Sequence, residues 1–143
     1  MLTVSDLMTV NPDTVASDTP LREVIDLMKI ECCRQLPVVD STGRLAGIIT
    51  DRDVRLAVNS PIVLHGRWQD EELIDKATAN NCMTPDPITV SSTVPAYRAA
   101  EMLSAYKFGA LPVVDSGELV GIITVTDFLD RFAAQQPARP VAH

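Results

Sequence analysis

The sequence predicts an α/β protein made of one small unit written twice, and three observations support this. Two stretches of the chain align with each other over most of their length. Each stretch contains short apolar runs typical of strands and a segment whose apolar residues recur at helical spacing. The composition, 46% hydrophobic and 22% charged in 143 residues, is that of a folded globular protein. We therefore predict two tandem β-α-β-β-α repeats packed about a pseudo-twofold axis.

The duplication becomes visible when Met8-Thr9 is aligned with Met83-Thr84. The segment Leu-Pro-Val-Val-Asp-Ser then occurs at 36–41 and 111–116. After one extra residue in the first copy, Thr42, Gly-Ile-Ile-Thr occurs at 47–50 and 121–124. Of 47 aligned pairs, 20 are identical, whereas ordinary compositions share roughly three by chance. The predicted boundaries are 1–59 for the first repeat, 60–81 for a linker, 82–134 for the second repeat and 135–143 for a flexible tail.

The first helix of each copy follows a short β-prone piece, at Thr14-Val15 and at Ile88-Thr89-Val90. In the first copy we expect Thr19 as the N-cap and Pro20 in the first helical turn. The apolar residues at helical spacing are Leu21, Val24, Ile25 and Met28 in the first copy, and Ala99, Met102 and Leu103, after Pro95, in the second.

A hairpin and a second helix complete each copy. In the first copy the apolar runs 36–39 and 45–49 flank the turn Asp40-Ser41-Thr42-Gly43, which is a hairpin signal. A helix is then expected to begin at Thr50, or at Thr124 in the second copy. In the linker, the segment 68–77 predicts an acidic amphipathic helix, with Trp68 as its anchor rather than as a ligand stacker.

Composition and charge exclude several classes of function. The net charge of −7 disfavours nucleic acid and anionic membranes, because both need a basic face. Three cysteines and two histidines fit neither a disulfide framework nor a zinc site, so we predict no metal. The N-terminus lacks the pattern of a signal peptide, and no apolar run approaches the ~20 residues of a membrane span. We expect a cytoplasmic protein without membrane contact.

The motif Thr-x-x-Asp occurs at 50–53 and at 124–127, each time between a strand and a helix. Its structural interpretation is a capping box, in which the hydroxyl and the carboxylate each accept a backbone N–H. A functional interpretation is compatible with this one. A helix N-terminus offers free N–H donors to phosphate, and a carboxylate there suits the vicinal hydroxyls of a ribose.

With these motifs, the chain resembles the cystathionine-β-synthase (CBS) domain family in its tandem form, the Bateman module. The resemblance runs from Val4 to Phe132 and rests on three duplicated motifs: Met-Thr-x-x-Pro, Leu-Pro-Val-Val-Asp and Gly-Ile-Ile-Thr-x-x-Asp. It implies a regulatory, non-catalytic module that binds AMP, ADP, ATP or S-adenosylmethionine in clefts between the copies. ATP could bind together with Mg. The resemblance also implies a homodimer that reports to an effector protein or domain.

The resemblance further implies which residues contact the ligand. The threonines and aspartates of the two motifs would hold ribose and phosphate, and the strand starts would hold the base. The nucleotide-binding residues expected on this basis are Thr14, Val15, Ala16, Arg34, Gln35, Leu36, Pro37, Thr50, Arg52, Asp53, Thr89, Val90, Ala110, Leu111, Pro112, Thr124, Thr126 and Asp127. For Val15, Val90, Leu36 and Leu111, a place in the core is the more favoured interpretation.

The two predicted sites differ in charge. Arg52 lies inside the first motif, where a guanidinium could grip two phosphate oxygens; a solvated helix-start arginine is the alternative. Thr126 stands at its position in the second motif. The first copy carries six cations and the second three. We therefore expect the first motif to be the main nucleotide site.

Two other functions compete with ligand sensing. An enzyme would need a nucleophile–base pair or a glycine-rich phosphate loop, and neither pattern is present. A ligand-free dimerisation or interaction module remains the alternative, because capping alone explains the motifs. A homodimer through the helices is expected in either case, on the assumption that the apolar helix surface, represented by Val24, Ile25, Met102 and Leu103, exceeds what one small unit can bury.

Overall fold

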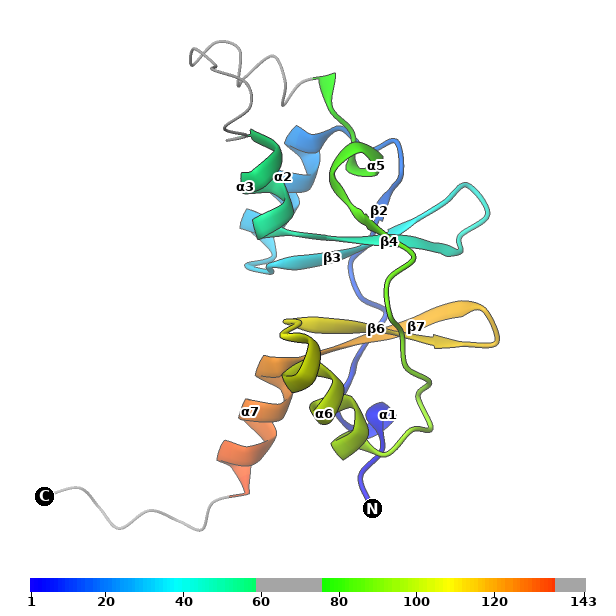
Figure 1. Cartoon of the computed structure of the whole chain (residues 1–143), viewed down its shortest axis with the longest axis vertical. Coiled ribbons are helices and arrows are strands. Elements are labelled where there is room, and N and C mark those ends of the chain that lie inside the picture. Colours follow the sequence, from blue (N-terminus) through cyan, green and yellow to red (C-terminus); the bar gives the residue numbers. More distant parts are fainter. Residues whose placement is uncertain (59–75, 136–143) are drawn as a thin grey trace, which may run out of the picture. The chain divides into compact units, whose positions relative to one another are not determined.

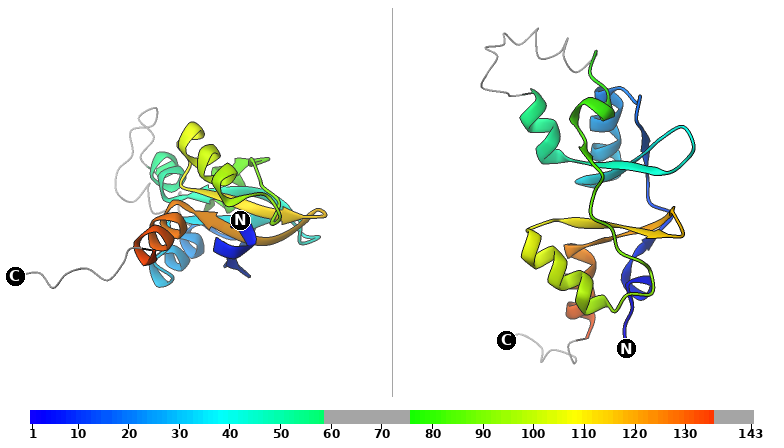
Figure 2. Two further views of the ribbon diagram at one scale, coloured as in Figure 1. Left: turned by 90° about the horizontal axis from the view of Figure 1, so that it is seen from below. Right: turned by 45° about the vertical axis from the view of Figure 1, so that its right-hand side comes forward.

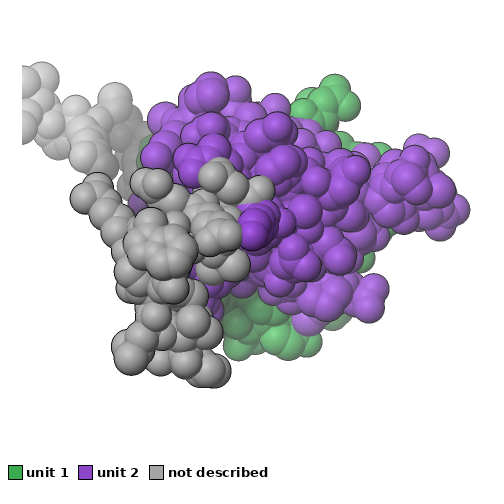
Figure 3. Space-filling model, turned by 90° about the horizontal axis from the view of Figure 1, so that it is seen from above, with its two compact units in different colours: residues 1–11, 89–115, 120–143 green, residues 12–88, 116–119 purple. Residues whose placement is uncertain are grey.

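The computed structural model of the chain describes residues 1–58 and 76–135 (Figure 1). The chain divides into two compact units, coloured separately in Figure 3. Unit 1 comprises Met1–Asn11, Thr89–Asp115 and Val120–His143, and unit 2 comprises Pro12–Ile88 and Ser116–Leu119. Each unit contains one sheet with helices packed on it, which confirms the predicted α/β class.

Unit 2 is built on a four-stranded sheet of order β2-β3-β4-β5. Strand β2 pairs parallel with β3, and the pairs β3–β4 and β4–β5 are antiparallel. The strands are β2 (Val15–Ala16), β3 (Gln35–Val39), β4 (Leu45–Thr50) and β5 (Thr84–Pro85). The helices are α2 (Leu21–Ile30), α3 (Asp51–Val58) and α5 (Ala79–Cys82).

Unit 1 repeats this arrangement with a three-stranded sheet of order β1-β7-β6. Val90 adds a parallel bridge to Val113, at the position that β2 occupies in unit 2. The strands are β1 (Thr9–Val10), β6 (Ala110–Asp115) and β7 (Glu118–Thr124). The helices are α1 (Val4–Leu7), α6 (Ala96–Tyr106) and α7 (Val125–Ala134). Figures 1 and 2 show α6 and α7 on the same face of this sheet.

The core of each unit lies between its sheet and the first long helix of its copy. In unit 2 the buried face of α2 carries residues at the predicted spacing, and these pack against apolar residues of β3 and β4. The fully buried residues include Leu21, Val24, Leu36, Val38 and Ile49. The corresponding cluster in unit 1 contains Ala99, Leu103, Leu111, Val113 and Ile123.

Two details of the predicted helices are wrong. The N-cap position of α2 is Pro20, not Thr19. The hydroxyl of Thr19 instead accepts a hydrogen bond from the backbone N–H of Ala16, at 2.9 Å, inside the turn that follows β2. Threonine hydroxyls stabilise turns as well as caps, and here the hydroxyl bonds within the turn.

The second error concerns the helix residues on which the expected homodimer rested. Val24 is fully buried and Leu103 is 4% exposed, while Ile25 and Met102 pack partly buried against the same cores. These side chains are already covered by the sheet of their own unit. They therefore offer little surface to a second copy.

The segments at the start of the two copies are exchanged between the units. Helix α1 and strand β1 lie at the start of the first copy but pack in unit 1, whereas α5 and β5 lie at the start of the second copy but pack in unit 2. In unit 1 the N–H of Val4 donates to the carbonyl of Val94 at 2.9 Å. In unit 2 the N–H of Ala79 donates to the carbonyl of Thr19, also at 2.9 Å. Each unit is therefore assembled from both halves of the sequence.

Two glycines make this exchange possible. A Cβ atom on Gly47 would lie 2.5 Å from the Sδ of Met83 and 2.7 Å from the backbone oxygen of Thr84. A Cβ atom on Gly121 would lie 2.7 Å from the Sδ of Met8 and 2.8 Å from the backbone oxygen of Thr9. Real Cβ atoms do not approach so closely. In each unit, the Met-Thr motif of one copy therefore packs against the Gly-Ile-Ile-Thr motif of the other copy.

The amphipathic helix expected at 68–77 falls almost entirely outside the described residues. The predicted tail does so as well, apart from Gln135.

We expect Gly47→Ala and Gly121→Ala each to lower the free energy of unfolding by about 1–3 kcal/mol, the usual cost of overpacking. The measurement is urea unfolding followed by far-UV circular dichroism. Met83 also packs against the core, so the single variant Met83→Ala is the reference for the double variant. Because the backbone oxygen of Thr84 is also in the way, Gly47→Ala should still be destabilising in a Met83→Ala background, though by less than in the wild type. No loss in that background would show that the methionine side chain alone makes the contact tight.

Candidate functional site

The first Thr-x-x-Asp motif begins helix α3 with a complete capping box. The N–H of Asp53 donates to the Oγ1 of Thr50 at 3.0 Å, and the N–H of Thr50 donates to the Oδ2 of Asp53 at 2.9 Å. Both side chains are half-buried. The structural interpretation of this motif is thus confirmed.

The second motif begins helix α7 in the same way. The N–H of Asp127 donates to the Oγ1 of Thr124 at 3.1 Å, and the N–H of Thr124 donates to the Oδ2 of Asp127 at 2.8 Å. The cap uses one oxygen of each carboxylate, and a carboxylate can accept about four hydrogen bonds. Capping therefore does not exhaust the capacity of Asp53 or Asp127 to accept from a ligand.

The strand that precedes each hairpin begins directly beside the motif. In unit 2 Gln35 pairs with Thr50 across β3 and β4, and the N–H of Asp51 donates to the carbonyl of Arg34 at 2.9 Å. In unit 1 the N–H of Val125 donates to the carbonyl of Gly109 at 3.0 Å. The structure therefore brings the expected base-binding strand start and the capped helix N-terminus together within each unit.

The short segments expected to complete the sites lie one strand further along. Val15 pairs with Val38 and Ala16 with Val39 in unit 2. In unit 1 the N–H of Val90 donates to the carbonyl of Pro112 at 3.1 Å. These segments border the middle and far end of the hairpin strand, so they lie further from the motif than its start does.

Burial divides the expected site residues into two groups. The side chains of one group belong to the cores, so any contribution to a ligand would come from their backbone: Val15, Leu36, Pro37, Val90, Ala110, Leu111 and Pro112. The others are exposed or half-buried and accessible: Thr14, Ala16, Arg34, Gln35, Thr50, Arg52, Asp53, Thr89, Thr124, Thr126 and Asp127.

The two motifs differ in charge within an otherwise matching geometry. Arg52 is exposed in the first turn of α3, and the matching residue of α7 is the uncharged Thr126. Three residues after Arg52, Arg55 forms an exposed ion pair with Asp51, with 3.8 Å between the Nη1 and Oδ2 atoms. Arg52 lies inside the motif and takes no part in this ion pair.

A polar network in unit 1 was not anticipated from the sequence. The hydroxyl and the backbone N–H of Ser92 and the hydroxyl of Ser91 all donate to the carboxylate of Asp115. The hydrogen bond from the Ser92 hydroxyl, with those from its N–H and from Ser91, holds the pKa of Asp115 below its usual value of 3.8. This network ties the residues after Val90 to the end of β6.

The matching aspartate of the first copy, Asp40, has different hydrogen-bond partners. Asp40 accepts hydrogen bonds from the hydroxyl and N–H of Thr42 and from the N–H of Arg44. The hydroxyl of Thr42, the extra residue of this hairpin, makes the largest contribution to the lowered pKa of Asp40. In the sequence, the two hairpin turns differ only by the extra residue Thr42. That difference predicts the longer turn around Asp40 but not the serine network around Asp115 in the other copy.

Comparisons with known proteins identify the family. A sequence model of the CBS domain matches residues 4–60 and again residues 79–134. The chain belongs to the CBS domain family. A CBS domain-containing protein of Dictyostelium discoideum is 35% identical over 128 residues, covering 89% of this chain and 88% of that protein.

Solved CBS pairs have the same fold. The crystal structure of CBSX2 in complex with AMP is 29% identical, with a TM-score of 0.80 over 96% of this chain and 100% of that one. The CBS domain pair of protein MJ0100, in complex with 5′-methylthioadenosine and S-adenosyl-L-methionine, is 28% identical, with a TM-score of 0.80 over 95% and 99%.

Enzymes also match this chain, but only over part of their length. Inosine-5′-monophosphate dehydrogenase of Methanocaldococcus jannaschii is 33% identical over 137 residues, which are 95% of this CBS pair and 24% of the enzyme. Within residues 1–58 and 76–135, no helix is long and apolar enough to cross a membrane. The same residues contain no cluster of three or more side chains suited to a metal ion.

The network around Asp115 predicts a pH dependence of stability. Because the folded-state pKa is depressed, the stabilisation is fully present above the unfolded value near 3.8 and is lost as the pH falls through the lower folded value. Asp115→Asn should therefore be less stable than the wild type at neutral pH, and the difference should shrink as the pH falls below 3.8.

Thermal unfolding from neutral to acid pH measures this difference, with Asp26→Asn, on the exposed face of α2, as the control for the loss of one negative charge. A difference that is constant across the whole range would contradict a role for the ionised carboxylate.

Proposed function

We propose that this CBS pair is a regulatory, non-catalytic module that binds an adenosyl nucleotide at its Thr-x-x-Asp motifs and signals to a partner protein or domain. The observation that carries the proposal is the geometry at the start of α3 and α7. In each unit a capped helix N-terminus, a half-buried carboxylate and an open strand start lie side by side. CBS pairs in complex with AMP and with S-adenosyl-L-methionine have matching folds.

Each part of this geometry suits one part of the ligand. The unsatisfied N–H groups and the positive end of the helix favour a phosphate. The oxygen of the carboxylate that the cap does not use can accept from the two hydroxyls of a ribose. The edge of a base could pair with backbone groups of residues 35–36 and 110–111 that the neighbouring strand does not engage. The carbonyls of Arg34, Gly109 and Pro112 already accept backbone N–H groups.

The ligands that fit are AMP, ADP, ATP and S-adenosylmethionine. Arg52 favours a phosphorylated ligand in unit 2, since a guanidinium binds phosphate oxygens in pairs. Mg could accompany ATP, because its phosphates supply the ligands that Mg prefers. Unit 1, with Thr126 at this position, depends on its helix N-terminus alone.

The remaining parts of the proposal concern the setting of the module. We propose that it acts in the cytoplasm, as a homodimer, on an effector whose identity lies outside this chain. A ligand-free dimerisation module is the second candidate, favoured by the fact that capping accounts for every hydrogen bond seen between Thr50 and Asp53.

A thermal shift panel separates the two candidates. If the module binds an adenosyl ligand, AMP, ADP, ATP or S-adenosylmethionine should stabilise it, by about 2.7 kcal/mol for a ligand at a hundred times its dissociation constant. Guanosine and inosine monophosphates serve as matched controls for the base. If no adenosyl compound shifts the melting temperature, the ligand-free module is the correct function.

Calorimetry on point variants locates the main site. Arg52→Ala should weaken ATP and ADP by about ten- to a hundredfold, the range of a lost charge-assisted contact, and should leave adenosine nearly unaffected. Arg55→Ala removes a cation of the same helix that is paired with Asp51, so it should change ATP affinity little. If the two variants lose ATP equally, general charge rather than a specific contact holds the phosphates.

The carboxylates are tested with asparagine, which keeps an oxygen for the cap but loses the charge. Asp53→Asn should weaken ATP and adenosine together, through the ribose. Asp127→Asn should have the smaller effect on ATP. The reverse order would place the main site in unit 1.

A further inference from the structure

The surroundings of the two Thr-x-x-Asp motifs differ by more than one arginine. Two segments meet at each motif: the end of the long helix with the start of the hairpin strand, and the first turn of the following helix. Four positions on these segments carry a charge in the first copy and none in the second. The matched pairs are Glu31 and Tyr106, Arg34 and Gly109, Asp51 and Val125, and Arg52 and Thr126.

An aromatic pair stands at the end of α6, where the first copy has Glu31 and Cys33. The ring centroids of Tyr106 and Phe108 are 5.3 Å apart and the ring planes meet at 18°, so the rings stack. The two side chains are nevertheless 53% and 39% exposed. Neither belongs to the apolar cluster that forms the core of unit 1. Packing of the core therefore does not account for the pair.

The pair lies beside the N-terminus of α7. Phe108 precedes Gly109, whose carbonyl accepts the N–H of Val125 at 3.0 Å. Val125 is the first residue of α7, and its side chain is 40% exposed. The helix N-terminus is the place proposed for the 5′ group of the ligand, where a nucleotide carries its phosphate. In unit 1 this place is therefore bordered by an aromatic residue on one segment and by an apolar residue on the other.

Lys107 supplies the single positive charge within residues 106–109 and 124–127. It is the C-cap of α6 and has a left-handed backbone, with a φ of 61°. A cation at this end of a helix is favoured by the negative end of the helix dipole and by the last carbonyls. The lysine therefore has a structural reason to stand at this position.

These surroundings favour an uncharged 5′ group over a phosphate. A phosphate beside Phe108 and Val125 would lose part of its hydration, and unit 1 has no arginine at the position of Arg52 to replace that hydration. An apolar group at the same place would remove both side chains from water, which is favourable. A thioether suits the place further, because sulfur makes favourable contacts with aromatic rings.

We infer that the second motif selects an adenosine compound with an uncharged, apolar 5′ group, whereas the first motif takes a phosphorylated one. Phe108 and Tyr106 are the specificity-determining residues of the second site. The inference rests on the proposed function, because it places the ribose of the ligand at Asp127. The two classes of ligand occupy different units, so they bind to one chain without competing.

Isothermal titration calorimetry on the full chain tests this with two probes that share the base and the ribose. AMP carries a phosphate, and 5′-deoxy-5′-isobutylthioadenosine carries a branched apolar thioether instead. The thioether probe should bind equally well to the free chain and to a chain whose tighter AMP site is saturated. If AMP at that concentration displaces the thioether probe, both compounds use one site and the inference is wrong.

Variants of the aromatic pair locate the second site. Phe108→Ala and Tyr106→Ala should each weaken the thioether probe by about three- to tenfold, the range of a lost aromatic contact, and should leave AMP unchanged. Phe108→Leu keeps the apolar bulk without the ring, so its affinity should lie between those of Phe108→Ala and the wild type. If both alanine variants bind the thioether probe as tightly as the wild type, the pair does not contact the ligand and the inference is wrong.

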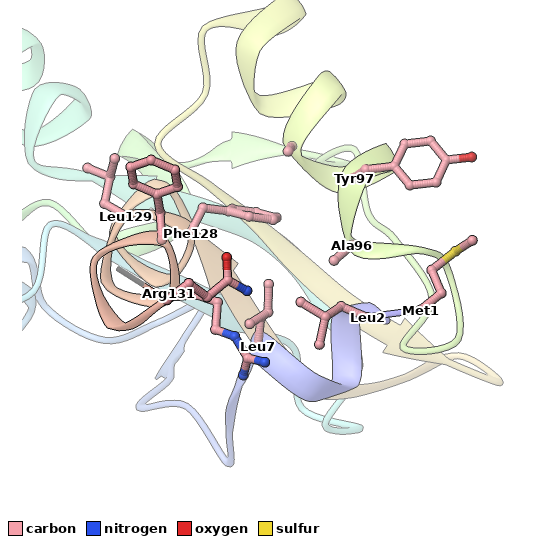
Figure 4. A pocket seen from close by; sticks show the side chains of 11 residues that line it. Met1, Leu2, Leu7, Ala96, Tyr97, Phe128, Leu129 and Arg131 are labelled. Carbon is pink, nitrogen blue, oxygen red and sulfur yellow. The ribbon is translucent and has the colours of Figure 1, made fainter. Parts of the chain in front are cut away.

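Tyr97→Ala is the matched control, because Tyr97 belongs to the same helix and is 50% exposed. It lies roughly 13 Å from Tyr106 along the helix axis, at 1.5 Å per residue, and Figure 4 shows its ring pointing away from α7. This variant should change the affinity of neither probe, and circular dichroism verifies that each variant is folded. An equal loss in Tyr97→Ala and Tyr106→Ala would overturn the inference, because it would show a general effect of altering α6.

Lys107→Ala tests the remaining cation and should leave both affinities unchanged. A weaker affinity for AMP in this variant would place a phosphate beside Lys107 and would overturn the selectivity of the second motif. The same titrations separate the inference from the proposed function. If AMP binds and the thioether probe does not, the proposed function stands and the inference fails. If neither probe binds, nor any adenosyl ligand of the thermal shift panel, the proposed function fails and the inference fails with it.

Discussion

The contact of each Met-Thr segment with a glycine of the opposite copy is the constraint on which the rest of the structure depends. Strand β5 can lie against β4 only because Gly47 has no side chain, and β1 can lie against β7 only because Gly121 has none. Neither copy completes its unit alone. Each glycine stands three residues before a motif threonine. The strand that makes the tight contact therefore also delivers Thr50 or Thr124 to the start of its helix, so the exchange of segments positions the candidate site.

On this shared backbone the two copies have diverged at a few positions, and the duplication acts as an internal control. Where both copies keep a residue, as at Asp53 and Asp127, the hydrogen bonds repeat almost distance for distance. Where they differ, the difference changes chemistry without changing the fold. In the first copy the extra Thr42 donates two hydrogen bonds to Asp40 within the turn. The second copy has no such residue, and Asp115 instead accepts hydrogen bonds from the hydroxyls of Ser91 and Ser92. Side-chain differences of this kind therefore indicate different tasks for the two units.

The parts of the structure that the sequence predicted are those that depend on neighbours in the chain. The hairpins, the helices and the two capping boxes follow from spacings of a few residues. The exchange of α1 and α5 could not be predicted this way, since it depends on contacts between segments that lie far apart in the sequence. The same holds for Val24 and Leu103: their spacing identifies an apolar helix face, but only the packed sheet decides whether that face is already covered. The capping boxes join residues three apart in the chain and could be predicted. The Asp115 network joins residues more than twenty apart, so it could not be predicted without the fold.

The divergence gives the two matching helices different surfaces. Helix α3 carries Arg52 in its first turn and an exposed ion pair, a surface that suits phosphate and water. Helix α7 begins with the same cap but lacks the arginine, and its apolar residues Val125, Leu129 and Phe132 are exposed. Because Val125 directly follows the threonine of the motif, the capped end and these apolar residues belong to one helix. A ligand bound at Thr124 and Asp127, as proposed, would therefore lie within one helical turn of an exposed apolar side chain. If a macromolecule covered these side chains and favoured binding of the ligand, the ligand would favour binding of that macromolecule by the same factor, because thermodynamic linkage is reciprocal.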